Sequence, residues 1–182
     1  ICNAGFKALW SKSEGFPLET FFSAMDEGLT YVVDEKMKRE ITPIGDQAGE
    51  LTEEAAKWMR LKPGIPVASG TLDGHAAVPA ATVTEPGKMV MIMGTSFAHL
   101  VLSNKEYRIP GMCGMVEDAI VPGLIAYEAG QACGGDHYSW FIKNAVPGAY
   151  EREARKRKLT LFELMEEKAR KLKPAESGLV AL

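Results

Sequence analysis

The pattern of hydrophobic and polar positions predicts a chain that mixes helices and strands. After Pro17, which suits the first turn of a helix, hydrophobic residues recur at helical spacing and predict an amphipathic helix over about 18–35. A second helix is predicted over about 52–61, since a threonine and two glutamates open it and a Pro-Gly pair follows it. An apolar run at 67–71 predicts a buried strand, and small residues at 76–82 predict a short helix.

From residue 88 onward the pattern is typical of β-structure. Strands are predicted at 88–93, 97–103, about 112–117 and 119–128, with a tight turn at 117–118 joining the last two. Strands that follow one another so closely indicate an antiparallel meander.

The end of the chain is predicted to be helical. One helix is expected over about 135–145, and another begins at Thr160, where Glu163 completes a capping box, and ends by Pro174. The basic run 152–158 lies between them and is interpreted as a solvated linker.

The segment Glu85-Pro86-Gly87 is the best candidate for a domain boundary, because Pro-Gly marks a turn and the pattern changes there. It predicts two domains, 1–86 and 87–182. The chain begins at Ile1, and residues 178–182 resemble a strand cut short. We therefore expect an internal piece of a longer protein.

Composition narrows the class of protein. The 182 residues are 46% hydrophobic and carry a net charge of -3. No apolar run approaches the roughly 18 residues of a membrane helix, and the slight acidity disfavours a nucleic-acid-binding surface. Three scattered cysteines without a CxxC pair favour a reducing, cytoplasmic location: Cys2, Cys113 and Cys133.

One carboxylate is placed as a general base would be. Asp73 follows the apolar run at 67–71 and lies among glycines and small residues that allow a substrate to approach. A carboxylate within reach of a hydroxyl can accept its proton during phosphoryl transfer. The alternative is an ordinary Asp-Gly turn.

The segment Gly94-Thr95-Ser96 lies between two predicted strands and could hold phosphate oxygens. Glycine lets the backbone approach a phosphate, and Thr95 offers hydroxyl and amide donors. A hairpin turn with incidental hydroxyls is the alternative. It is no Walker-type loop, since GxxxxGK[ST] does not occur in the chain.

Two further charged residues stand in apolar surroundings. Glu128 ends an apolar strand and faces either solvent or a cleft. Lys7 lies within an apolar stretch and either has a partner or extends its ammonium group to water. The histidines lack metal-ligand spacing, which favours structural roles for His75, His99 and His137.

Taken together, these segments resemble the carbohydrate kinases of the FGGY family. The resemblance covers essentially the whole chain, and its short motifs keep the family's order and spacing. It is greatest to the bacterial members that phosphorylate L-ribulose. The segments that carry it are 2–10, 70–77, 94–96 and 120–131.

The resemblance implies an α/β, ribonuclease-H-like fold of two domains, the actin/hexokinase/Hsp70 type, with this chain spanning the domain junction. Residues 1–86 would end the sugar-binding domain, and 87–182 would begin the nucleotide-binding domain. Asp73 would be the catalytic base and would also contact the sugar. The other implied sugar contacts are Lys7 and Glu128, and the implied nucleotide-binding residues are Gly94, Thr95, Ser96, Gly134, Gly135 and Ser139.

The implied reaction is the ATP-dependent phosphorylation of L-ribulose to L-ribulose 5-phosphate in L-arabinose catabolism. ATP and Mg²⁺ would be required, no metal ligand is expected in this piece, and a homodimer is compatible with the family. The piece lacks the first phosphate loop and the adenine pocket, so we expect it to be inactive alone. Alternatives are another FGGY kinase, for xylulose, glycerol or a related sugar, and a non-catalytic actin-like binding module.

Overall fold

The computed structural model describes residues 1–37 and 40–179. By their internal contacts these residues form two units. The first comprises residues 1–93 and 97–131, and the second comprises 94–96 and the chain from Ala132 on. Helices and strands occur together, as predicted for an α/β protein.

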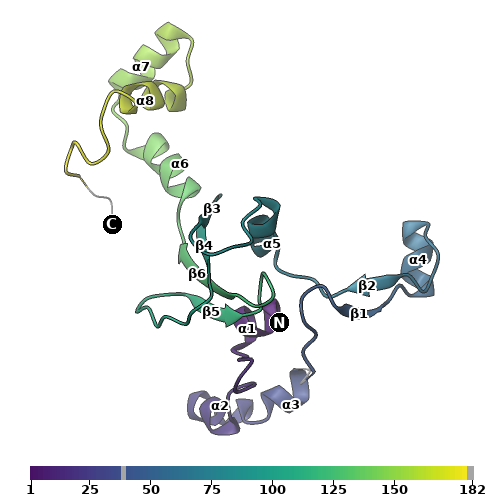
Figure 1. Cartoon of the computed structure of the whole chain (residues 1–182). Coiled ribbons are helices and arrows are strands. Elements are labelled where there is room, and N and C mark those ends of the chain that lie inside the picture. The colour runs from purple at the N-terminus through teal and green to yellow at the C-terminus, as the bar shows by residue number, and fades with distance from the viewer. Residues whose placement is uncertain (38–39, 180–182) are drawn as a thin grey trace. The chain divides into compact units, whose positions relative to one another are not determined.

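The first unit is organised by a four-stranded antiparallel sheet (Figure 1). Its strands are β3 (Met89–Met93), β4 (Phe97–Ser103), β5 (Gly114–Glu117) and β6 (Ile125–Gln131). The order is β3-β4-β6-β5, so β6 lies between β4 and β5. The predicted meander is therefore wrong: the chain leaves β4, forms the edge strand β5, and returns through β6 to pair with both.

The strand predicted at 119–128 begins later than expected. Asp118 has a left-handed backbone (φ 56°), and its Oδ1 accepts a hydrogen bond of 2.6 Å from the amide of Gly123. This contact closes a loop where the sequence predicted a tight turn. Ala119 and Ile120 lie in that loop, but both are buried in the core. These two residues are hydrophobic because they are buried in the core, although they do not belong to a strand.

Two helices, α1 (Cys2–Ala8) and α5 (Asp73–Ala80), contact this sheet. Residues 2–8 were predicted only as an apolar stretch, and α5 begins three residues before its predicted start. The helices and the inner face of the sheet share one core, formed by Cys2, Val78, Val83, Leu100, Leu102, Val116, Ala119, Ile120 and Ala126.

The long helix predicted over 18–35 is broken into α2 (Glu19–Met25), a 3₁₀ turn (Glu27–Leu29) and α3 (Val32–Lys36). Asp26 causes the first break. Its backbone is extended (φ -160°, ψ 130°), and its Oδ1 accepts a hydrogen bond of 2.8 Å from the amide of Gly28. An aspartate that caps a new turn competes with continuation of the helix.

The predicted buried strand at 67–71 is also corrected. The structure has a shorter strand, β2 (Pro66–Ala68), which is exposed along its length and pairs antiparallel with β1 (Gln47–Glu50). Between them lies the expected helix, α4 (Glu53–Met59), whose cap Thr52 accepts a hydrogen bond from the amide of Ala55. Among the described residues no further element packs on this two-stranded ribbon closely enough to bury its apolar side chains.

The second unit contains α6 (Gly135–Asn144), α7 (Gly148–Arg157) and α8 (Leu161–Ala169). The predictions of α6 and α8 are confirmed, including the reciprocal capping box of Thr160 and Glu163. The linker interpretation of 152–158 is wrong, because most of that run belongs to α7.

No helix among the described residues is long and apolar enough to cross a membrane. The cytoplasmic location and the domain boundary at residues 85–87 stay predictions.

Candidate functional site

Asp73 is the first residue of α5 and is exposed. The sequence had suggested that Asp73 follows a strand directly. Strand β2 ends at Ala68, however, so the carboxylate lies at the start of a helix. Its Oδ1 accepts a hydrogen bond of 2.8 Å from the amide of Gly74. His75 and Val78 are buried, and they fix the helix against the sheet while Asp73 remains accessible.

A buried chain of polar contacts joins three elements of the first unit. Sγ of Cys2, on α1, lies 2.9 Å from Nδ1 of His75, on α5. Nε2 of the same ring lies 2.9 Å from Oε2 of Glu128, on β6. The His75 side chain is 4% exposed and that of Glu128 is 21% exposed. The chain of contacts thus runs from the core toward an accessible carboxylate.

The electrostatics of this chain follow from burial and hydrogen bonding. Burial by itself lowers the pKa of His75, but the hydrogen bond and charge of Cys2, followed by those of Glu128, outweigh it and raise the pKa above 6.5. Burial raises the pKa of the Cys2 thiol, yet hydrogen bonds, led by that of His75, lower it below 9.0 overall. The two groups therefore favour a proton on the imidazole more than either would alone.

Glu128 is the fourth residue of β6 and not the end of a strand. It lies opposite Leu100 of β4 and Gly114 of β5. The interpretation of a purely solvated carboxylate is wrong, because Glu128 accepts a hydrogen bond from a buried histidine.

Lys7 lies in the last turn of α1 and is exposed. The three predicted sugar contacts, Lys7, Asp73 and Glu128, therefore lie on the three elements that the polar chain joins. In the part of the chain that the structure describes, no hydrogen bond or ion pair links these three side chains directly.

Sequence reasoning missed the polar chain. Both Cys2 and His75 lie in segments that carry the family resemblance, but His75 received only a structural role, and Cys2 received no role in the site. The one available signal was the position of His75 two residues after Asp73. The contacts span 73 and 53 residues along the chain, and no local spacing encodes them.

The predicted nucleotide-binding residues gather in the second unit. Gly94-Thr95-Ser96 forms the exposed connection between β3 and β4. The amide of Gly134 donates to the carbonyl of Thr95, and the amide of Gly135 donates to the carbonyl of Gly94, each over 2.8 Å. The structure therefore brings together two glycine-containing segments about forty residues apart in sequence.

Gly135 has a steric reason to be glycine. A Cβ atom at this position would lie 2.5 Å from the carbonyl oxygen of Gly94. Close backbone approach of this kind is a typical use of glycine. Ser139 lies one turn further along α6 and is half-buried. The simple hairpin interpretation of residues 94–96 is incomplete, because the turn is held by the start of α6.

Nothing in the described residues forms a cluster of three or more histidine, cysteine, aspartate or glutamate side chains that could hold a metal ion. An apolar hollow of about 670 Å³ lies between α6 and α8, lined mainly by aromatic and aliphatic side chains. It contains none of the predicted site residues.

Comparison with known proteins gives a consistent result. The model of the FGGY family of carbohydrate kinases, C-terminal domain, matches residues 89–181. A ribulokinase of Halalkalibacterium halodurans is 50% identical and one of Shouchella clausii is 49% identical, each over 181 residues. A ribulokinase of Mycolicibacterium smegmatis is 41% identical over 182 residues. All of this chain is covered, but it spans only 32% of each of these proteins.

Among solved structures, the xylulose kinase of Rhodospirillum rubrum is similar, with a TM-score of 0.51 and 29% sequence identity. The likeness covers 61% of this chain and 23% of the xylulose kinase.

Proposed function

This chain belongs to the FGGY family of carbohydrate kinases, and we propose that the protein carrying it transfers the γ-phosphate of ATP to L-ribulose. The product is L-ribulose 5-phosphate, as in L-arabinose catabolism. The observation that carries the proposal is the identity to ribulokinases, which reaches 50% and extends over the entire chain.

Asp73 is the proposed general base. Its exposed carboxylate lies on a helix that is anchored by buried His75. It accepts the proton of the terminal hydroxyl of the sugar as that oxygen attacks the γ-phosphorus, and ADP leaves with the electrons of the broken P–O bond. Lys7 and Glu128 are the proposed sugar-binding residues.

Thr95 and Ser96 are the proposed phosphate contacts, because their exposed segment offers hydroxyl and amide donors. Gly134 and Gly135 act differently. Their amides are already bonded to the carbonyls of Thr95 and Gly94, so they shape the turn that meets the phosphates. Ser139 is proposed to lie near the nucleotide from α6.

Mg²⁺ would enter with ATP and neutralise charge on the transferring phosphates. None of the described residues is assigned to it, since they contain no cluster of three or more metal ligands.

The second candidate function is phosphorylation of a different sugar, and the likeness to a xylulose kinase favours it. A non-catalytic binding module is the third, and it predicts ATP binding without sugar-dependent turnover.

The proposal is tested by sugar-dependent release of ADP from the full-length protein, with L-ribulose, D-ribulose, D-xylulose and glycerol as substrates. We expect the fastest turnover with L-ribulose. Asp73→Asn should lower kcat by more than about 100-fold, since a general base contributes roughly 10²–10⁴-fold. Glu53→Gln, which also changes the first residue of a helix, is the matched control and should leave kcat unchanged.

If turnover is fastest with another of the four substrates, the assignment as a kinase would stand and that substrate would replace L-ribulose in the proposal. Near-wild-type turnover in Asp73→Asn would refute the assignment of the base, and ATP binding without any turnover would favour the binding module.

A further inference from the structure

We infer that His75 is a positioning residue for sugar binding, acting through the carboxylate of Glu128. The inference rests on the proposed function, because it takes Glu128 to contact the sugar. It adds a residue that does not itself touch the substrate, and it gives the buried contacts of His75 a role in substrate affinity.

The His75 ring has one orientation in which both of its nitrogens have polar partners. Its two nitrogens contact Cys2 and Glu128 at 2.9 Å each. The ring of Phe6 packs against it with centroids 4.6 Å apart and planes inclined at 52°. Rotating the imidazole by half a turn would put carbon atoms where both nitrogens now lie. Both polar contacts would then be lost, and the ring nitrogens would be left buried without hydrogen-bond partners, which is costly.

Nε2 of His75 carries the proton that reaches Glu128. Whether the shared proton lies on the thiol of Cys2 or on Nδ1, the opposite nitrogen of the ring carries its own hydrogen and donates it to Glu128. Glu128 therefore receives the same donor in both states. A hydrogen bond to an ionised carboxylate is stronger than one between neutral groups, so it holds one oxygen in place.

Solvent exposure increases along the chain of contacts from Cys2 to Glu128. Cys2 is 1% exposed, the His75 side chain 4%, and the Glu128 side chain 21%. Only the last member reaches accessible surface. A carboxylate has two oxygens and accepts several hydrogen bonds, so Oε2 can remain on His75 while Glu128 also accepts a hydroxyl donor.

A glutamate side chain has several rotatable bonds and loses conformational freedom when a ligand fixes it. Fixing it before the ligand arrives removes that cost, which is how supporting hydrogen bonds sharpen a binding site. A purely structural role for His75 makes a different prediction. If His75 were purely structural, replacing it would lower the stability of the protein and would weaken the binding of ATP and of the sugar alike.

The test compares two amides at position 75 in the full-length protein. His75→Asn places its amide nitrogen near the position of Nδ1 and cannot reach Glu128. His75→Gln extends to the position of Nε2 and restores a donor to the carboxylate. We expect KM for L-ribulose to rise about tenfold or more in His75→Asn and to recover at least partly in His75→Gln. KM for ATP should stay within about twofold of the wild type in both variants.

A double-mutant cycle with Glu128→Ala, which removes the acceptor of the His75 hydrogen bond, separates positioning from general damage. If His75 acts through Glu128, the double variant His75→Asn/Glu128→Ala should bind L-ribulose no more weakly than Glu128→Ala alone. Binding of L-ribulose is measured calorimetrically without ATP. His99→Asn is the control, because His99 pairs with Ala129 on the opposite face of the same sheet, and it should leave sugar affinity unchanged.

Two failures are distinguishable. If the wild-type protein binds none of the four sugars, both the proposed function and this inference are overturned. The inference is overturned, while the kinase assignment stands, if the wild type binds L-ribulose and His75→Asn binds it equally well. The same conclusion follows if His75→Asn lowers the affinity for ATP by the same factor as the affinity for L-ribulose. Additive effects in the cycle would also overturn the inference.

Discussion

At the scale of single residues, two glycines decide how α1 meets the sheet. A Cβ atom on Gly5 would lie 2.4 Å from Cγ1 of Val116, and one on Gly114 would lie 2.6 Å from Cδ1 of Phe6. Each glycine therefore accommodates a side chain from the opposite element. This contact carries Cys2 to within hydrogen-bonding distance of His75.

Gly114→Ala should lower the stability of the full-length protein. The added methyl group would overlap the ring of Phe6, which is held between α1 and the sheet, and overpacking of this kind typically costs about 1–3 kcal/mol. Thermal unfolding should show a lower Tm. Gly49→Ala is the matched control, because Gly49 also lies in a strand and nothing is within 4 Å of its added Cβ. Equal Tm values for the two variants would contradict this account.

Residue chemistry was only partly predictable. The sequence identified Asp73, Glu128 and the Gly94-Thr95-Ser96 segment because each combines a reactive type with flanking small or apolar residues. It could not identify the partner of Glu128. His75 is unremarkable in sequence, and its role depends on burial and on contact with β6.

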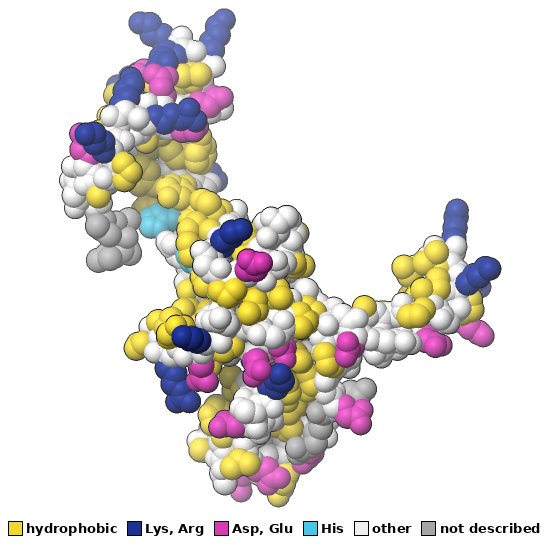
Figure 2. Space-filling model, viewed as in Figure 1, with side chains coloured by type: hydrophobic (Ala, Val, Ile, Leu, Met, Phe, Trp, Pro, Cys, Tyr) yellow, Lys and Arg dark blue, Asp and Glu magenta, His cyan; other side chains and the backbone are white. Residues whose placement is uncertain are grey.

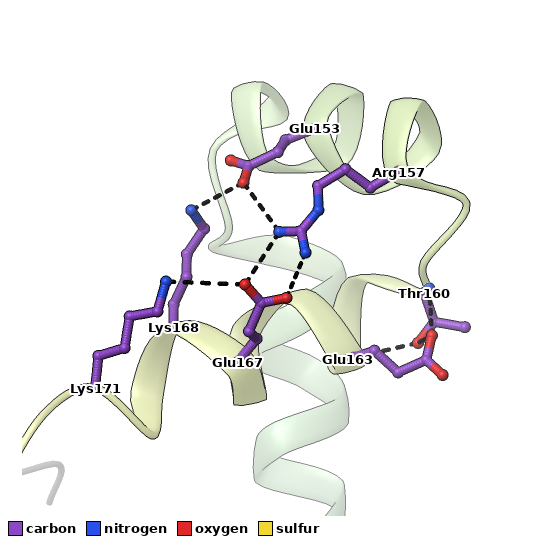
Figure 3. A network of polar contacts seen from close by, with 7 residues as sticks. All are labelled: Glu153, Arg157, Thr160, Glu163, Glu167, Lys168 and Lys171. Atoms are coloured by element: carbon purple, nitrogen blue, oxygen red, sulfur yellow. Dashed lines mark hydrogen bonds and ion pairs between the residues drawn. The ribbon is translucent and has the colours of Figure 1, made fainter.

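At the scale of elements, α7 and α8 lie in contact and are joined by ion pairs between their side chains (Figure 3). Arg157 forms ion pairs with both Glu153 and Glu167, and Nζ of Lys168 lies 3.1 Å from Oε1 of Glu153. Ala154 and Leu164 are buried. The sequence predicted α8 because a capping box is a local signal. It missed α7 because the basic run was interpreted from its charge, and no cap like that of α8 marks the start of α7.

The α7–α8 pair should loosen in acid. The pKa of Glu163 is lowered from 4.5 by hydrogen bonds from the Thr160 backbone and hydroxyl, and that of Glu167 is lowered chiefly by its hydrogen bond to Arg157. A carboxyl group whose pKa is lower in the folded state stabilises the fold above 4.5 and loses that contribution as the pH falls through its folded pKa.

Amide exchange of residues 148–169 in the full-length protein, corrected for intrinsic rates, should therefore show falling protection between about pH 5 and pH 3. Glu167→Gln should show less dependence on pH over this range and lower protection at pH 6. Protection that is independent of pH in the wild type would contradict the role of these carboxylates.

At the scale of the whole molecule, the fold class is confirmed. The chain has the mixed α/β architecture of the FGGY carbohydrate kinases, which is of the ribonuclease-H-like type. Many hydrophobic side chains nevertheless reach the surface in both units (Figure 2). On β3 they alternate regularly, since Met89, Met91 and Met93 are exposed while Val90 and Ile92 pack against the core.

The 182-residue chain on its own should self-associate. Its β3 strand is an edge strand with an apolar outer face, and such edges promote aggregation. We expect light scattering to show oligomers and the dye ANS to bind. Replacing Met89, Met91 and Met93 with threonine, which keeps β-propensity, should reduce both signals. A monodisperse monomer that does not bind ANS would refute this prediction.

The sequence by itself determined the features that depend on local signals. The capped starts of α4 and α8, the strand β3 and the hairpin to β4 depend on residues within a few positions of one another, so the local sequence pattern alone reveals them. Order and spacing of short motifs likewise sufficed for the family, which the comparisons confirm.

Only the tertiary structure decided which distant residues meet. It placed β6 between β4 and β5, joined Cys2, His75 and Glu128, and set Gly135 against Gly94. The separations along the chain run from 8 residues, between Glu117 and Ile125 in the β5–β6 pair, to 73 residues, between Cys2 and His75. The free energy of these contacts comes from burial and from hydrogen bonds formed in a shared core, and that core exists only once the elements have packed together.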